Sequence, residues 1–167
     1  MATHEMHAEF ISVDRTVIEN ILLHLDENII ATGTTSLRTL ESLYWLGVKL
    51  AVNKEPYPGL LTLDQWEVYE MDIQDMPAKK AMMTLLDWMK KNNTQELLAK
   101  TQIIIAPGYS FRIIKGLVTN FHQPQSTLLL LVAALIGDDW RKVYNYALKN
   151  QFRFLSYGDG SLLWNVG

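Results

Sequence analysis

The sequence predicts an α/β fold in which helices flank a mainly parallel sheet. Short apolar runs typical of buried strands alternate with segments whose apolar residues recur at helical spacing. The chain has 167 residues, 49% of them hydrophobic and 20% charged, which is the composition of an ordinary globular protein. No internal repeat is visible in the sequence. We therefore expect a single α/β domain over residues 1–167.

The first third of the chain is expected to form a helix, a strand and a second helix. Residues 12–14 offer caps for an amphipathic helix that ends near residues 26–27. Residues 28–33 are typical of a short buried strand. Residues 34–36 then form a turn that caps a helix beginning at Leu37.

The middle third is expected to contain a loop, two helices and two strands. Residues 53–74 lack a period and read as loop with short extended pieces. Pro77 occupies a first helical position, and a short helix is expected at residues 95–99. Residues 101–106 and 112–119 are predicted to be strands because they are rich in β-branched and apolar residues.

The last third begins with a polar turn at residues 120–124. Ser126 caps a helix over residues 127–136, and Gly137 ends it. This helix carries no charge, so we expect it to be buried on all sides. A last helix follows, and residues 152–157 are predicted to form a fourth strand.

Composition excludes several classes of protein. Fifteen Lys and Arg against 18 Asp and Glu give a net charge of −3, which supplies no global positive field for nucleic acid. The absence of cysteine excludes disulfides, Cys-based zinc sites and a thiol nucleophile. Neither a Walker A nor a GxGxxG motif occurs, and no apolar run approaches the length of about 18 residues that spans a bilayer. Without a signal-peptide pattern, the expected location is the cytoplasm, with no membrane partner.

Three predicted strands end in polar or glycine-rich turns. These turns are residues 33–36, 120–122 and 157–159. In α/β sheets the ligand site forms just past the carboxyl ends of the strands. We therefore expect the functional site at these turns.

The first of these turns precedes a helix and consists of Gly33, Thr34, Thr35 and Ser36. Backbone N–H groups and three hydroxyls there could bind an anionic or hydroxylated ligand, although a simple helix cap explains the same residues. Arg38 in the first turn opposes the helix macrodipole, so it needs a specific partner. That partner is either Glu41, one turn on, or a bound carboxylate or phosphate.

The amino-terminal segment offers His7 and Glu9 as candidate ligand-binding residues. The segment HEMH does not match the zincin motif, because its histidines are separated by three positions instead of four. In an extended segment His7 and Glu9 would share one face, whereas the alternative is a frayed terminus.

His122 lies between a predicted strand and the most apolar helix, where an imidazole could act as acid or base. A structural histidine that hydrogen-bonds the turn is the alternative. Asn120 supplies a donor and an acceptor for a ribose or a base edge. Asp159, between Gly158 and Gly160, is a carboxylate on a tight loop and serves either the turn or the site.

Two aromatic residues, Tyr109 and Phe111, follow Gly108 in an extended segment. They could face a planar ring, although aromatic residues at this spacing are usually part of the core. Gly108 is typical of a turn.

Five separated segments carry a resemblance to a known family. They are residues 6–9, 33–42, 106–112, 117–128 and 153–159, which read MHAE, GTTSLRTLES, APGYSFR, LVTNFHQPQSTL and RFLSYGD. In order and wording they resemble the S-adenosylmethionine:tRNA ribosyltransferase-isomerases of queuosine biosynthesis. The resemblance covers most of the chain and is weak between Asn53 and Lys100.

The resemblance implies transfer and isomerisation of the ribosyl moiety of S-adenosylmethionine to 7-aminomethyl-7-deazaguanine in tRNA, giving epoxyqueuosine. S-adenosylmethionine is then a co-substrate, with no other cofactor and no metal expected. His7, Glu9 and His122 become candidates for handling protons. The remaining matching positions would bind substrate: Gly33, Thr34, Thr35, Ser36, Arg38, Glu41, Gly108, Tyr109, Phe111, Asn120, Phe121, Tyr157, Gly158 and Asp159.

The main departure from the family is length, since its members are about twice as long. The chain therefore resembles the C-terminal portion of a two-domain enzyme, part of an incomplete α/β barrel-like domain, whose partner would be the missing N-terminal half. A second interpretation stays open: a stand-alone module that binds S-adenosylmethionine or a nucleoside without catalysis.

Overall fold

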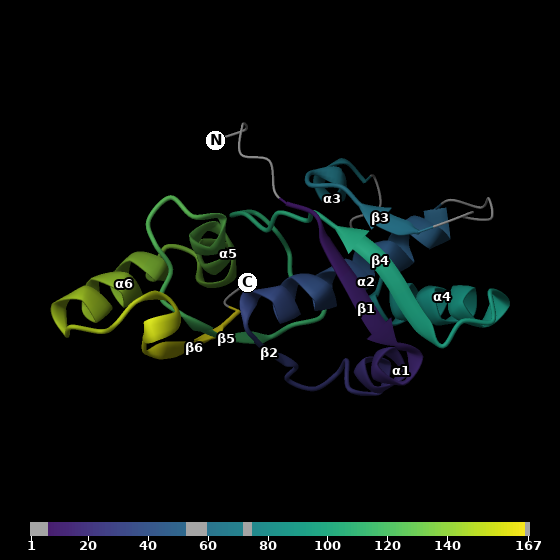
Figure 1. Ribbon diagram of the computed structural model, residues 1–167, viewed down its shortest axis with the longest axis horizontal. Helices are drawn as coiled ribbons and strands as arrows, with labels where there is room; N and C mark the ends of the chain where they lie inside the picture. The colour runs from purple at the N-terminus through teal and green to yellow at the C-terminus, as the bar shows by residue number, and fades with distance from the viewer. Residues whose placement is uncertain (1–6, 53–59, 72–74, 166–167) are drawn as a thin grey trace. The chain divides into compact units, whose positions relative to one another are not determined.

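A computed structural model describes residues 7–52, 60–71 and 75–165, and the chain folds into two compact units (Figure 1). The first unit comprises residues 1–27 and 39–103, and the second comprises residues 28–38 and 104–167. Each unit is therefore built from two separate stretches of chain around one small three-stranded sheet.

The sheet of the first unit has the order β1-β4-β3, with β1 (Glu9–Asp14), β4 (Glu96–Thr101) and β3 (Leu61–Leu63). β1 runs antiparallel to β4, and β3 runs parallel to it. Alternate residues point to the core, so that Ile11 and its β4 partner Ala99 are both buried.

The first unit also contains α1 (Arg15–Leu23), α3 (Glu67–Glu70), α4 (Ala78–Lys91) and most of α2 (Thr34–Val52). Tyr44 on α2 is buried, and its hydroxyl donates a hydrogen bond of 2.8 Å to the backbone oxygen of Met76. At Gly47, α2 approaches α4 so closely that a Cβ atom would lie 2.2 Å from the backbone oxygen of Ala81. Two helix backbones thus meet here with no room for a side chain.

The sheet of the second unit has the order β2-β5-β6, with β2 (Ile30–Thr32), β5 (Gly116–Asn120) and β6 (Gly160–Trp164). β2 is parallel to β5, and β6 is antiparallel to it. One face of this sheet is buried through Ala31, Leu117 and Leu163. The opposite face exposes apolar side chains: Ile30, Val118, Leu162 and Trp164.

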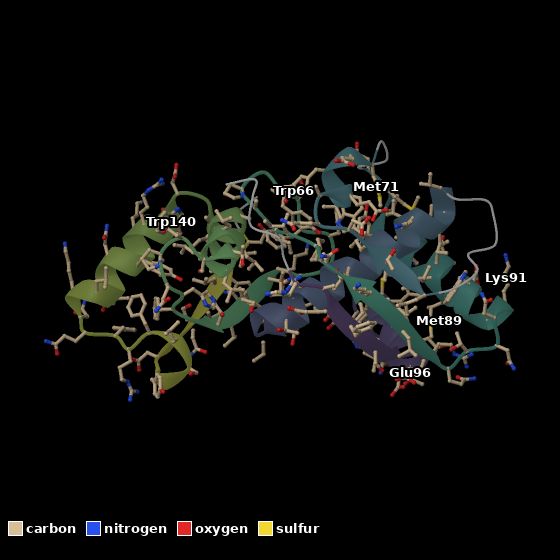
Figure 2. All side chains as sticks on the ribbon, turned by 45° about the horizontal axis from the view of Figure 1, so that its top comes forward. Trp66, Met71, Met89, Lys91, Glu96 and Trp140 are labelled. Carbon is tan, nitrogen blue, oxygen red and sulfur yellow. The ribbon has the colours of Figure 1, made fainter. Side chains whose placement is uncertain are left out.

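The helices of the second unit are α5 (Thr127–Ile136), α6 (Asp139–Lys149) and the short 3₁₀ helix η1 (Leu155–Tyr157). Ser126 caps α5, because its hydroxyl accepts a hydrogen bond of 3.2 Å from the Leu129 amide. Trp140 lies in the first turn of α6 (Figure 2). No helix within the described ranges is long and apolar enough to cross a membrane.

The α/β class is confirmed, but the sheets are mixed and not mainly parallel, since each contains one parallel and one antiparallel pair. Two separate sheets replace the single one, and the first of them contains β1, for which the sequence predicted no strand. The barrel-like arrangement and the single domain over residues 1–167 stay predictions.

Three predicted elements are wrong. The helix expected at residues 95–99 does not form, because residues 96–99 belong to β4, where pairing with strands on both sides decides the conformation. Residues 102–106 form no strand, and the Ile103 amide donates to the Thr101 hydroxyl at 3.2 Å instead of to a neighbouring strand. Residues 152–157 are not a strand either, because Leu155 has a φ of 60° and begins η1.

Helix α5 is apolar throughout, but it is not buried on all sides. Leu131, Val132, Leu135 and Ile136 are buried, whereas residues 127–130 are half-buried. An all-apolar sequence shows that burial is possible, and the neighbouring elements determine how much of the helix they cover.

Candidate functional site

In the second unit, the turn after β2 is tied to the neighbouring strand β5. The Gly33 amide donates a hydrogen bond of 2.8 Å to the Val118 oxygen, and Gly33 has a φ of 89°, which favours glycine. Helix α2 starts directly afterwards, at Thr34. The predicted turn 34–36 is therefore the first turn of the helix, and Thr35 and Ser36 are exposed there. The helix starts early because Gly33 alone makes the turn.

The end of β5 carries Asn120, whose side chain reaches the loop before β6. Its Nδ2 atom donates to the oxygens of Gly158 and Asp159, at 3.3 and 3.4 Å. Two of the three predicted strand-end turns are thus joined by one side chain. The amide of Asn120 stabilises the loop and is half-buried.

His122 is buried two residues beyond β5, and both its ring and its backbone have partners. Its Nε2 atom lies 3.0 Å from the Thr119 Oγ1 atom, and its backbone N–H donates to the Tyr144 hydroxyl at 3.0 Å. Burial lowers the pKa of His122, so the imidazole is neutral at neutral pH. The geometry fits a neutral base whose orientation Thr119 sets, and it fits a structural histidine equally well.

The low pKa of His122 predicts a pH-dependent stability. In the unfolded chain the imidazole binds a proton below its ordinary pKa of 6.5, whereas the folded state stays neutral to a lower pH. The contribution of His122 is therefore fully present above pH 6.5 and is lost as the pH falls below it. We expect the urea midpoint of the second unit to fall between pH 7.5 and 5.5, and His122→Gln to remove that part of the slope.

A matched control is His24→Gln, since the His24 side chain is exposed and its Nδ1 atom lies 2.7 Å from the Asn20 oxygen of the preceding helical turn. His24 lies in the first unit, so this variant should leave the contribution of His122 to the slope in place. An unaltered slope in His122→Gln would contradict the prediction.

Phe121 is a core residue of the second unit. It is buried, and its ring contacts Tyr144, Phe152 and Phe154 at centroid distances of 5.4, 5.6 and 5.4 Å. The contacts with Tyr144 and Phe152 are edge-on and the contact with Phe154 is tilted, and aromatic packing of this kind stabilises the unit. Phe121 therefore supports the backbone between Asn120 and His122.

The loop before β6 holds Asp159 and Gly158 in structural roles. The Asp159 carboxylate accepts hydrogen bonds from the Arg153 amide at 2.8 Å and from its guanidinium at 3.4 Å, and these contacts lower the pKa of Asp159. A Cβ atom on Gly158 would lie 2.0 Å from the Arg153 oxygen. Tyr157, in contrast, projects from this loop with its surface 83% exposed.

Tyr109 and Phe111 contact each other edge-on, with ring centroids 5.1 Å apart. Tyr109 is buried and Phe111 is half-buried. Gly108 precedes them with a φ of 98°, in a turn closed by the Tyr109 amide and the Ala106 oxygen. Tyr109 is therefore a core residue, whereas Phe111 is only partly covered.

Arg38 and Glu41 lie one turn apart on α2, and both are buried. Buried charges are costly unless they are paired, so both side chains serve a specific interaction. Glu41 belongs to the first unit and Arg38 to the second.

His7 and Glu9 also belong to the first unit, where Glu9 begins β1 and pairs in register with Thr101. His7 is exposed and Glu9 is half-buried. In the second unit, the Asn120 side chain joins Gly158 and Asp159, and Gly33 bonds β5 at Val118.

One hollow that sequence reasoning did not consider lies on the first unit beside α3. It has a volume of about 480 Å³ and is lined by Asp64, Gln65, Trp66, Glu67, Glu70 and Gln102, with Trp66 labelled in Figure 2. Glu67 in this lining forms an ion pair with Lys49, with 2.6 Å between its Oε1 atom and the lysine Nζ atom. In the described part of the chain, no three His, Asp or Glu residues are grouped so that they could hold a metal ion.

Comparison with known proteins identifies the family. The family model described as queuosine biosynthesis protein matches residues 1–163. The chain belongs to this family. The predicted resemblance is therefore confirmed, and it extends through residues 53–100, where the motifs were weak.

Similar curated proteins are S-adenosylmethionine:tRNA ribosyltransferase-isomerases. That of Prochlorococcus marinus strain MIT 9312 is 35% identical over 93% of this chain, and that of Bradyrhizobium diazoefficiens is 34% identical over 99%. The crystal structure of the S-adenosylmethionine tRNA ribosyltransferase from Thermotoga maritima matches 92% of the chain with 28% identity and a TM-score of 0.59. The chain spans about a third of the length of these curated relatives and 40% of the Thermotoga chain.

Proposed function

We propose that this chain is the C-terminal portion of an S-adenosylmethionine:tRNA ribosyltransferase-isomerase. The reaction would transfer the ribosyl group of S-adenosylmethionine to 7-aminomethyl-7-deazaguanine in tRNA and isomerise it to epoxyqueuosine, with release of adenine, methionine and a proton. The observation that carries the proposal is the family match over residues 1–163. S-adenosylmethionine is consumed as a co-substrate, so no further cofactor is expected.

His122 is the best-supported proton acceptor in the second unit. Its imidazole is neutral at neutral pH because burial lowers its pKa, and a neutral imidazole can accept a proton. The carbon next to a sulfonium is the acidic position of S-adenosylmethionine, so a neutral base beside it would start the reaction. His7 and Glu9 stay candidates for the other proton transfers.

The first turn of α2 would bind the charged end of the co-substrate. Backbone N–H groups and the exposed hydroxyls of Thr35 and Ser36 lie there, at the positive end of a 19-residue helix dipole. A carboxylate such as that of the methionine moiety is the ligand this arrangement favours. Thr34 and Arg38 are proposed to complete this end of the site, and Asn120 and Asp159 to form its other side.

Two experiments on the 167-residue chain test the proposal. Titration calorimetry measures the binding of S-adenosylmethionine. Mass spectrometry of nucleosides detects epoxyqueuosine in tRNA that has been incubated with the chain and S-adenosylmethionine. We expect Thr35→Val to weaken binding about tenfold, since one hydrogen bond to a charged group is lost. Thr35 is exposed, so this variant should fold normally. Arg141→Ala on α6 is the control and should bind as the unchanged chain does.

The outcomes separate the two functions under consideration. Binding together with epoxyqueuosine formation supports the enzyme. Binding without product supports a module that binds S-adenosylmethionine without catalysis. A folded chain that binds no S-adenosylmethionine overturns both.

A further inference from the structure

The two units differ in charge, although the whole chain is acidic. The second unit contains seven Lys and Arg: Arg38, Arg112, Lys115, Arg141, Lys142, Lys149 and Arg153. It contains three acidic residues, Asp138, Asp139 and Asp159, which leaves a net charge of +4. The first unit has the other eight basic and fifteen acidic residues, a net charge of −7. The overall charge of −3 therefore conceals a basic unit, and basic surfaces attract nucleic acid.

Within the second unit, exposed basic and aromatic side chains follow one another along the segment from α6 to η1. Tyr146, Lys149, Arg153 and Tyr157 are all exposed. The Tyr146 ring is 61% exposed and contacts Phe152 at a centroid distance of 5.9 Å. Exposed rings with cations between them are the combination that proteins use to bind single-stranded RNA, through stacking and phosphate contacts.

The turn that carries Tyr157 is held firmly in place. The Leu155 amide donates to the Phe121 oxygen at 2.9 Å, and the Asp159 amide donates to the Arg153 oxygen at 3.1 Å. Asn120 adds its hydrogen bonds to the backbone at residues 158 and 159. Leu155 also has a φ of 60°, which costs energy in a residue other than glycine. These contacts fix the backbone on both sides of Tyr157.

A large aromatic ring on a fixed turn loses little freedom when it binds a partner, and this favours stacking. Arg153 belongs to the same turn, and its side chain is 70% exposed while it contacts Asp159. A nucleobase on Tyr157 would thus have a guanidinium nearby for the adjoining phosphate.

We propose that the segment from α6 to η1 is an RNA-binding surface, with Tyr157 stacking on an unpaired base and Lys149 and Arg153 contacting the backbone. The proposal rests on the proposed function for its RNA substrate. It assigns RNA recognition in this chain to the basic second unit.

Fluorescence anisotropy tests this surface, with a labelled, unmodified 17-nucleotide anticodon stem-loop as the probe and no S-adenosylmethionine present. Tyr157→Ala should weaken binding about tenfold or more, because one base loses its stacking partner. Tyr157→Phe should bind within twofold of the unchanged chain, since the ring is kept. Lys149→Glu should weaken binding severalfold and flatten its salt dependence.

The matched control is Lys79→Glu, which makes the same charge change at an exposed position of α4 in the acidic unit. It should leave RNA affinity unchanged. Equal losses in Lys79→Glu and Lys149→Glu, or unchanged affinity in Tyr157→Ala, would overturn the proposed surface. Self-association of the chain that Tyr157→Ala abolishes would also overturn it, because the surface would then bind protein.

Calorimetry with S-adenosylmethionine distinguishes failure of the RNA-binding surface from failure of the proposed function. A chain that binds S-adenosylmethionine but no RNA contradicts the surface alone. A chain that binds RNA through Tyr157 but no S-adenosylmethionine contradicts the proposed function and leaves the surface in place.

Discussion

Gly158→Ala is expected to destabilise the second unit by about 1–3 kcal/mol or more, because there is no space for the added methyl group. The new Cβ atom would lie 2.0 Å from the Arg153 oxygen and 2.5 Å from its carbon, both backbone atoms that no side-chain rotation can move. The loop must open, and the hydrogen bonds from Asn120 to residues 158 and 159 are then lost. Urea unfolding at pH 7.5 measures the loss.

Gly160→Ala is the matched control, two residues further along, at the first position of β6. Its nearest neighbour would be the Thr119 oxygen at 3.6 Å, an ordinary contact distance. We expect its stability to stay within about 0.5 kcal/mol of the unchanged chain. Equal midpoints for the two variants would show that the loop tolerates a side chain at position 158. NMR shifts at Asn120 and His122 should change only in Gly158→Ala.

Gly47→Ala is expected to destabilise the first unit, although the same change in an exposed helix stabilises by about 1 kcal/mol. The added Cβ atom would lie 2.2 Å from the Ala81 oxygen and 2.6 Å from its carbon, so α2 and α4 must separate. Overpacking of this kind costs about 1–3 kcal/mol and exceeds the gain in helix propensity. Urea unfolding followed by circular dichroism should show a lower midpoint.

The double variant Gly47→Ala with Ala81→Gly identifies which atoms of α4 clash with the added methyl group. Ala81→Gly removes the Ala81 methyl group but leaves its carbonyl in place, so it should not rescue Gly47→Ala. Rescue would show that side chains, and not backbones, are in contact. A raised midpoint in Gly47→Ala alone would contradict the close approach of the two helices.

Local sequence signals predicted the helices better than the strands. The periodicity of α4 and α6 and the Ser126 cap of α5 appear in the sequence, because a helix closes its hydrogen bonds within itself. β4 was mistaken for a helix, because its two neighbours, β1 and β3, come from distant parts of the chain. Strands that depend on such partners leave a weak local pattern.

The sequence indicates where the polar turns lie, but not what their residues do. The Asn120 side chain joins the turns at residues 120 and 158–159 in the second unit, and the Gly33 amide bonds β5 at Val118. Residues 158–159 precede β6 and end no strand, because the strand predicted at residues 152–157 does not form. Phe121 and Asp159 turned out to hold the fold, since an aromatic ring and a carboxylate serve cores and loops as readily as ligands. The charge difference between the units was invisible in the total composition, because it appears only when the residues are divided by unit.

The course of the chain through the two units sets how it must fold. Ile30 pairs with Gly116, 86 positions later, and Glu9 pairs with Thr101, 92 positions later. Each of these pairings requires a long loop to close, which costs conformational entropy before the strands make any contact. Sheets with such pairings form slowly. Neither unit corresponds to one continuous segment, so during synthesis neither sheet can be completed until most of the chain has been made. The exposed apolar strands would meanwhile be available to chaperones or to aggregation.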